Sequence, residues 1–409
     1  MIKNIIFCAL ASLSITGNLF PIAEPKELLL NRISGSIFGG LIGDALGKPT
    51  EFIKTPKEIF KHFPSGIKSF EDLKKFNLCW HNAKSNKFYA PYTDDTAMVR
   101  LTLNVLLESR KNSWDLSRTM EFLAISYVDD LNSLTGWAMQ ERAPGNACLK
   151  SVKKLHDIIN IDKNKPKDWW QAGDKNAAGC GAVMRAHAFG IIFADNPEKA
   201  AMWAAEHSKI THGHQISQAA CAAMAIGMAY AIQGKSKEFI IQQMIEWARN
   251  YDPVEERFNV YTNKTEKSCW AKMEDALALA RSAKQSSIEL EKNDLVFGAN
   301  NIELNTLFKK SDQCKIFYKY EGWAADDAIA ATLYTFALID NVNNAIVIGV
   351  HTPGDSDSIA SMAGALVGAC VGLKELTQDH DISVYEGSLT LENYALKAAS
   401  LLADKSINR

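Results

Sequence analysis

The sequence predicts an all-α protein. Apolar residues recur at spacings of three and four over long stretches, and the strict alternation typical of strands is hard to find. The 409 residues are 47% hydrophobic and 22% charged, which is ordinary globular composition with ample length to bury a core. We therefore expect one large helical domain or two intimate ones.

The first residues, 1–23, differ in composition from the rest of the chain. Lys3 precedes an apolar run that ends at Phe20, and Ala23 is the last small residue before a charged segment. This order is typical of a secretory leader, and a frayed or docked N-terminal helix is the alternative. We expect 1–23 to be a signal peptide for export to the periplasm or the medium, and 24–409 to form the domain. Without a functional leader the protein would be cytoplasmic.

Six stretches carry the helical pattern, and they are residues 95–110, 114–131, 197–208, 216–233, 325–339 and 358–373. The fourth and sixth are rich in alanine and glycine, which lets helix axes approach closely in a core. Their apolar runs, 219–232 and 359–373, are shorter than the roughly 20 residues of a membrane span, so we expect none. Polar connectors over 54–86 and 285–319 indicate long surface excursions.

Charge and cysteine usage exclude several classes of protein. A formal net charge of -2 provides no field that would gather nucleic acid or anionic lipid, so we expect neither as a partner. The eight cysteines lack C-x-x-C pairs and zinc-finger spacing. Loss of Cys8 with the leader would leave seven, an odd number that argues against a fully paired disulfide framework.

Two adjacent carboxylates stand at the start of the helix predicted over 95–110. Asp94 and Asp95 lie between Thr93 and Thr96, and together these side chains form a dense set of hard oxygen ligands. Helix capping is the simpler interpretation, because one threonine or aspartate is enough to cap a helix. On its own, this motif leaves a cap and a metal site as open alternatives.

A second loop, at residues 351–358, repeats this chemistry. Asp355, Asp357 and Ser358 lie in a turn with glycine and proline that opens the helix predicted over 358–373. The Asp-x-Asp spacing lets both carboxylates converge on one centre, and two such loops supply the four carboxylates that a two-cation site needs. An all-oxygen set favours Mg²⁺, Mn²⁺ or Ca²⁺ over zinc. Together the two loops favour a metal site.

Other segments carry weaker signals. Glu51 follows a glycine-rich helical stretch that lets a backbone or a ligand come close, although a lone glutamate is usually a solvated surface acid. For His212, a ligand contact, a helix cap and an exposed loop are open alternatives. Two glycine turns each precede an apolar-periodic segment, and backbone amides at such a helix start can bind phosphate. A purely structural turn is the commoner explanation. The residues of these two turns are Gly145, Asn146, Gly179, Cys180, Gly181 and Ala182.

The order of these motifs resembles the ADP-ribosylglycohydrolase family, which includes the dinitrogenase reductase-activating glycohydrolase and the animal ADP-ribosylhydrolases. The resemblance spans roughly residues 33–400 in collinear order, and its motifs lie at 43–52, 92–96, 142–146, 179–185, 211–212 and 354–360. It implies a single large orthogonal helical domain with a di-metal cleft that holds two divalent cations, Mg²⁺ or Mn²⁺.

The resemblance also implies roles for the matched residues. Glu51, Asp94 and Asp355 would be catalytic, with Glu51 at the mouth of the site, where it ligates or gates metal and takes part in proton transfer. The metal ligands would be Thr93, Asp94, Asp95, Asp355, Asp357 and Ser358. The two glycine turns would wrap the diphosphate and distal ribose, and His212 would lie beside the ADP-ribose. Cys180 stands where asparagine is frequent in the family, which removes an amide that could bond ribose or phosphate.

The expected activity is metal-dependent hydrolysis of the glycosidic bond of an ADP-ribosylated protein or ADP-ribose derivative, with release of ADP-ribose. This cleavage needs a positioned water, a carboxylate and an oriented ribose, which the clustered acids and their cations can supply. One alternative is a non-catalytic ADP-ribose-binding or structural protein, which would have no need of carboxylates that repel each other without cations. The other is a two-metal phosphoesterase acting on the diphosphate, and histidine ligands common in such sites are lacking.

Overall fold

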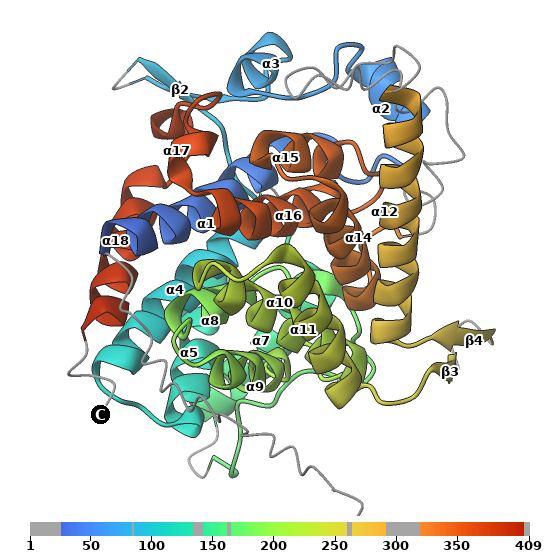
Figure 1. Cartoon of the computed structure of the whole chain (residues 1–409). Coiled ribbons are helices and arrows are strands. Elements are labelled where there is room, and N and C mark those ends of the chain that lie inside the picture. The colour runs from blue at the N-terminus through green and yellow to red at the C-terminus, as the bar shows by residue number, and fades with distance from the viewer. Residues whose placement is uncertain are drawn as a thin grey trace, which may run out of the picture.

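The computed structural model of the chain describes residues 26–83, 86–133, 142–161, 165–259, 264–291 and 320–404. The expected leader, 1–23, and most of the connector predicted over 285–319 lie outside these residues. Within them, the all-α prediction is confirmed, because helices make up nearly all of the regular structure (Figure 1).

The six predicted helices are all present, with ends that shift by up to two residues. They are α4 (Asp94–Lys111), α5 (Leu116–Ser133), α9 (Pro197–Ser208), α10 (Gln215–Ile232), α14 (Ala325–Leu338) and α16 (Ser356–Val371). Local signals explain the ends: Asn196 caps α9 ahead of Pro197, and Thr93 caps α4 through its hydroxyl. The other main helices are α1 (Lys26–Gly47), α7 (Asn146–Ile161), α8 (His187–Ile192), α11 (Lys237–Tyr251), α12 (Cys269–Glu291), α15 (Val342–Val350), α17 (Leu373–Leu376) and α18 (Ser388–Ala403).

The connector predicted over 54–86 contains regular structure that the fading periodicity did not indicate. It forms α2 (Pro56–His62), α3 (Phe70–Lys75) and the first strand of a hairpin, β1 (Trp80–Asn82), which pairs with β2 (Lys87–Tyr89). Thr55 caps α2, and Ser69 with Asp72 forms a capping box for α3. Helices this short have too few turns to show an apolar period, so the capping residues are the only sequence signal for them. A second hairpin joins β3 (Glu256–Asn259) to β4 (Lys264–Lys267).

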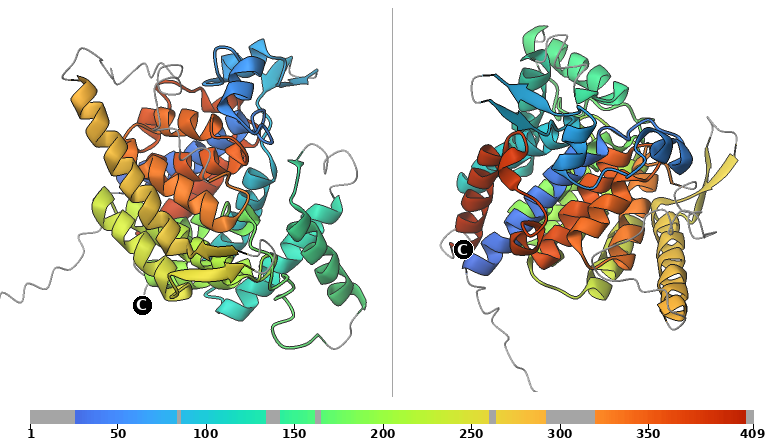
Figure 2. Two further views of the ribbon diagram at one scale, coloured as in Figure 1. Left: turned by 90° about the vertical axis from the view of Figure 1, so that its right-hand side faces the viewer. Right: turned by 90° about the horizontal axis from the view of Figure 1, so that it is seen from above.

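The helices are arranged in two layers with α12 along one side (Figures 1 and 2). In one layer α1 and α16 run antiparallel in close contact, beside α14 and α15, and in the other α4, α8, α9, α10 and α11 pack together. The pair α5 and α7 projects from this body (Figure 2). Helix α10 is long and apolar enough to cross a membrane, but 83% of that stretch is buried within the molecule, which identifies it as the core helix of the fold.

Glycines permit the contact between α1 and α16. A Cβ atom on Gly39 would overlap the carbonyl oxygen of Gly364, and one on Gly43 would overlap that of Ala360. This contact brings the C-terminal end of α1 beside the N-terminal end of α16. There the Thr50 hydroxyl donates to the carbonyl of Val350 at 2.6 Å and lies 2.9 Å from the Ser356 hydroxyl.

Six cysteines fall within the described residues, and all are free thiols: Cys79, Cys148, Cys180, Cys221, Cys269 and Cys370. In this part of the chain the fold therefore does not depend on disulfides.

Candidate active site

The second acidic loop is held rigidly ahead of α16. Gly354 adopts φ +99°, where a side chain is strained, and a Cβ there would overlap the carbonyl of Glu321. The backbone N–H of Asp355 donates to that same carbonyl at 2.8 Å. Gly354 also exchanges backbone hydrogen bonds with Phe52 and Ile53, each 3.0 Å long. The loop therefore has little freedom, and its carboxylates are placed by backbone contacts.

The first acidic loop begins α4 and is fixed by a buried acid from α1. Asp44 accepts hydrogen bonds from the backbone N–H groups of Thr93 and Thr96, each at 2.9 Å. Thr93 is buried, and its hydroxyl accepts from the N–H of Asp95 at 3.2 Å. Capping and carboxylate clustering, which the sequence left as alternatives, thus occur together. Thr93 does not line the cavity described next, and its role as a ligand stays a prediction.

The two loops and Glu51 meet at one cavity of about 200 Å³. The carboxylate oxygens of Glu51, Asp355 and Asp357 lie within 4.8 Å of one another. The Ser358 hydroxyl donates to Asp95 at 3.2 Å, which joins the second loop to the first. The predicted site residues that line the cavity are Glu51, Asp94, Asp95, Gly145, Asn146, Gly179, Cys180, Gly181, His212, Asp355, Asp357 and Ser358.

The pKa values of these acids reflect their crowding. Burial, followed by the charges of Asp355 and Asp94, raises the pKa of Glu51 to about 9. Burial raises the pKa of Asp94, Asp95 and Asp357 well above the usual value, and neighbouring carboxylates raise each of them further. Each negative charge is therefore costly in the protein alone. A compensating positive charge would remove that cost.

The donor atoms fit divalent cations. One oxygen of Asp95 and one of Asp357 are buried without a hydrogen-bond partner, which is unfavourable unless another ligand occupies that position. Every carboxylate in the cluster presents hard oxygen, the atom type that Mg²⁺ and Mn²⁺ prefer. Asp95, Asp355, Asp357 and Glu51 are thus the residues that could hold a cation pair, with Asp94 at the cavity wall.

The glycine turns form the other end of the cavity. A Cβ on Gly181 would lie 2.9 Å from the ring of His212, so glycine allows this close approach. Burial and the charge of Arg185 lower the pKa of His212 to about 3, and its imidazole is therefore neutral at pH 7. Gly145 and Asn146 lie exposed at the start of α7, where backbone N–H groups are available to an anion.

One of the predicted binding residues does not line the cavity, and another turns its side chain towards the acids. Ala182 is completely buried in the core and does not line the cavity, so only its backbone could serve a ligand. The Cys180 thiol points towards the acids, and its sulfur lies 2.8 Å from Asp355 and 3.4 Å from the Ser358 hydroxyl. The thiol at this position thus contacts the acidic loop.

The structure adds supporting residues that the sequence reasoning missed. Arg185 is fully buried and donates to the carbonyl of Gly181 at 2.6 Å and to Thr211 at 2.7 Å, which fixes the glycine turn against the segment that carries His212. Arg142 forms a bidentate ion pair with Glu386 and also donates to the carbonyl of Tyr92, just before the first acidic loop. An arginine lies within four residues of each glycine turn and was the available signal, but sequence alone did not show that its side chain points inwards.

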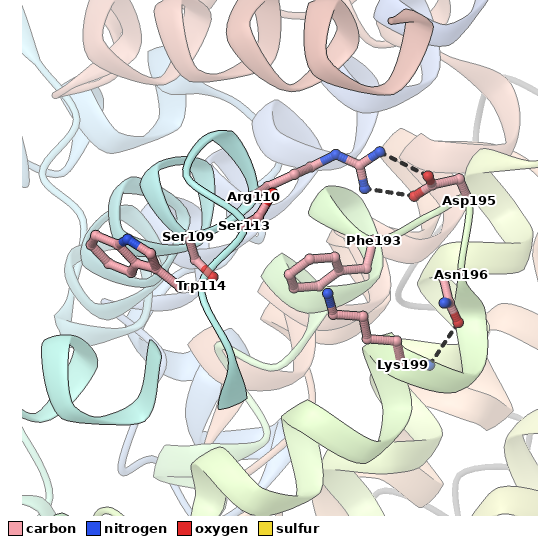
Figure 3. Close-up of a pocket in the computed structure, with 8 residues that line it drawn as sticks. All are labelled: Ser109, Arg110, Ser113, Trp114, Phe193, Asp195, Asn196 and Lys199. Atoms are coloured by element: carbon pink, nitrogen blue, oxygen red, sulfur yellow. Dashed lines mark hydrogen bonds and ion pairs between the residues drawn. The ribbon is translucent and has the colours of Figure 1, made fainter. Parts of the chain in front are cut away.

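A second cavity, also of about 200 Å³, lacks these properties. Its single carboxylate, Asp195, is already paired with Arg110 through bonds of 2.6 and 2.7 Å (Figure 3). Asn196 there caps α9 by accepting from the N–H of Lys199. The groups in this cavity are therefore engaged in structural contacts, and the acidic cavity is the better candidate site.

The fold and the site define a class: an all-α protein with an acidic cavity between helix ends. The chain belongs to the ADP-ribosylglycohydrolase family, whose pattern it matches over residues 25–405. It is 22% identical to the ADP-ribosylhydrolase ARH3 of Xenopus tropicalis, over 91% of this chain and 96% of that protein. It is also 22% identical to the ADP-ribosylarginine hydrolase Tri1 of Pseudomonas putida, over 85% of this chain and 72% of that protein. A solved structure described as an ADP-ribosylglycohydrolase-related protein complex shares the fold, with a TM-score of 0.58 and 17% identity over 92% of this chain and 99% of that one.

Proposed function

We propose that the protein is a metal-dependent ADP-ribosyl hydrolase that releases ADP-ribose from a modified side chain or small molecule. The observation that carries this proposal is the meeting of two aspartate loops and Glu51 at one cavity, with buried carboxylate oxygens that have no protein partner. Family membership and the names of the two hydrolase relatives support the substrate class.

The protein's own groups suit this reaction. Divalent cations, when bound, would supply positive charge that orients the ribose hydroxyls and a water. Glu51 is partly exposed at the cavity, and the positive charge of bound cations would favour its ionised form. The carboxylate could then take the proton of the attacking water and pass it to the leaving group. The open start of α7 can accept the diphosphate through backbone N–H groups. Neutral His212 can donate or accept a hydrogen bond without adding charge.

The test is release of free ADP-ribose from arginine- and serine-modified peptides in Mg²⁺ or Mn²⁺ and in chelator. The wild type is expected to release ADP-ribose only with metal, and Asp355→Ala is expected to lose at least about 100-fold in rate, as for other removed electrostatic groups. Glu71→Ala serves as the matched control, because its side chain is an acid that is 74% exposed on α3.

The products separate this function from the alternatives. Release of AMP would identify a phosphoesterase that cleaves the diphosphate. Tight binding of ADP-ribose without release from either peptide would identify a binding protein. Equal release in chelator and in metal would contradict the metal dependence.

A further inference from the structure

Two aromatic side chains are stacked in the open at the mouth of the acidic cavity. The rings of Phe52 and Trp323 lie 5.2 Å apart between centroids with an angle of 21° between planes. They are 60% and 39% exposed, and Trp323 lines the cavity. Large apolar groups in contact with water at the edge of a polar site are costly in the free protein, which indicates that they contact something else.

The backbones that carry both rings are bonded to segments that line the acidic cavity. Phe52 directly follows Glu51, and its N–H donates to the carbonyl of Gly354 at 3.0 Å. The carbonyl of Trp323 accepts from the N–H of Cys180 at 3.0 Å, and the preceding Gly322 lies against the Cβ of Asp355. The stack therefore has a fixed position relative to the carboxylates.

Phe52 holds this position in an unfavourable backbone conformation. Its φ is +68°, in the left-handed region that bulky residues rarely adopt. This conformation is maintained by two backbone hydrogen bonds to Gly354 of the second acidic loop, one from the N–H of Phe52 and one to the carbonyl of Ile53. Strain of this kind persists where the surrounding structure enforces it, and it is concentrated at functional sites.

The molecule shows what such a stack can bind. A second stacked pair, Trp114 and Phe122, has centroids 4.4 Å apart, and Phe122 is 39% exposed. The guanidinium of Arg118 lies over both of these rings, at 5.0 and 5.8 Å. Among the described residues, no lysine or arginine lies over Phe52 or Trp323, so that stack is open to a cation from outside.

We infer that the Phe52–Trp323 stack receives the acceptor side chain of the substrate, and that it selects a planar cation, the guanidinium of an ADP-ribosylated arginine, over a serine. Guanidinium groups stack on aromatic faces and pair with carboxylates at the same time, and Glu51 and the exposed Glu321 flank the two rings in the chain. A serine acceptor offers neither a plane nor a charge. This inference rests on the proposed function and names its substrate class.

The experiment compares kcat/KM for ADP-ribosylated arginine and serine peptides of otherwise identical sequence, with Mg²⁺. The wild type is expected to prefer arginine. Trp323→Leu should reduce that preference about tenfold, or about 1.4 kcal/mol, through KM for the arginine peptide. Trp323→Phe keeps an aromatic face and should retain most of the preference. Phe122→Leu, in the remote stack, is the matched control and should change nothing.

Two binding measurements make the outcomes distinct. Calorimetry with free ADP-ribose should give the same affinity for the wild type and Trp323→Leu, and a loss of affinity would assign the stack to the adenine ring and overturn the inference. The affinities of the arginine-modified and serine-modified peptides are also measured with the chelator-treated protein. Their ratio gives the arginine preference in binding, without hydrolysis. An arginine preference in binding without any release would refute the proposed function alone. Release without an arginine preference, or with a preference unchanged in Trp323→Leu, would refute this inference alone.

Discussion

At the scale of single residues, Asp44 shows how one buried acid can organise the site without lining it. Its side chain is fully buried, and its carboxylate caps the start of α4 from a different helix. A carboxylate at this end of a helix is stabilised by the unpaired N–H groups and by the helix dipole. Asp44 thereby fixes Asp94 and Asp95, and its charge also raises the pKa of both.

Asp44→Ala is expected to destabilise the folded protein by about 2 kcal/mol, because the N–H groups of Thr93 and Thr96 would be left buried and unpaired. Asp44→Asn keeps one acceptor oxygen and should cost about half as much. Both variants should weaken Mg²⁺ binding, since the first acidic loop loses its anchor. Urea unfolding and calorimetric titration with Mg²⁺ measure these effects. Unchanged stability of Asp44→Ala would show that the cap contributes little.

The sequence predicted the ligand-type residues of this site better than their supports. Asp355 and Asp357 stood out because clustered acids in a tight turn have few structural uses. Asp44 and Arg185 did not stand out, since a single charged residue in an apolar stretch gives no indication of the partner it faces. The orientation of Cys180 towards Asp355 depends on contacts between segments far apart in the chain, which local patterns do not encode.

At the scale of elements, the contact between α1 and α16 determines where the acids lie. Helix α1 carries Asp44 and leads to Glu51, and α16 begins at the second acidic loop. The small residues of α16 predicted a close helix contact, but the sequence did not identify α1 as its partner. Long helices with a clear period were predicted well, whereas the short α2 and α3 were not.

Two adjacent glycines of α1 test the importance of this contact. Gly39→Ala should destabilise the protein by about 3 kcal/mol, because the new methyl would overlap the backbone of Gly364 and force the helices apart. Gly40→Ala places its methyl 3.6 Å from the nearest atoms, an ordinary contact, and should be neutral or gain up to about 1 kcal/mol from helix propensity. Thermal unfolding and ADP-ribose release measure both. Equal effects of the two substitutions would contradict a packing role specific to Gly39.

At the scale of the whole molecule, the site makes the metal-free protein less stable than its core would allow. The carboxylates lie between two well-packed layers that hold them together, and their mutual repulsion opposes folding whenever they ionise. The sequence could identify the charged residues but not how strongly their repulsion opposes folding, because that repulsion depends on how deeply the completed fold buries the carboxylates. Stability should therefore respond to pH and to metal together.

The direction of that response follows from the raised pKa of Glu51. Its carboxyl binds a proton in the folded state up to about pH 9, whereas in the unfolded chain it loses that proton near 4.5, so unfolding releases protons between these values. The free energy of unfolding must then fall as pH rises across this window. Buried His207 and His212, whose pKa values are lowered, give the opposite slope below about 6.5, so the window from pH 7 to 8.5 lies above the histidine contribution.

Thermal unfolding in chelator should accordingly show a melting temperature that falls from pH 7 to 8.5, and Glu51→Gln should flatten this slope. Saturating Mg²⁺ or Mn²⁺ should restore stability, by about 2.7 kcal/mol at a hundredfold excess over Kd. The gain should be larger at pH 8.5 than at pH 7, because cations bind the ionised carboxylates and compete with protons. A metal increment that is the same at every pH, or that persists in Asp355→Ala, would mean that the cations bind somewhere other than this cluster.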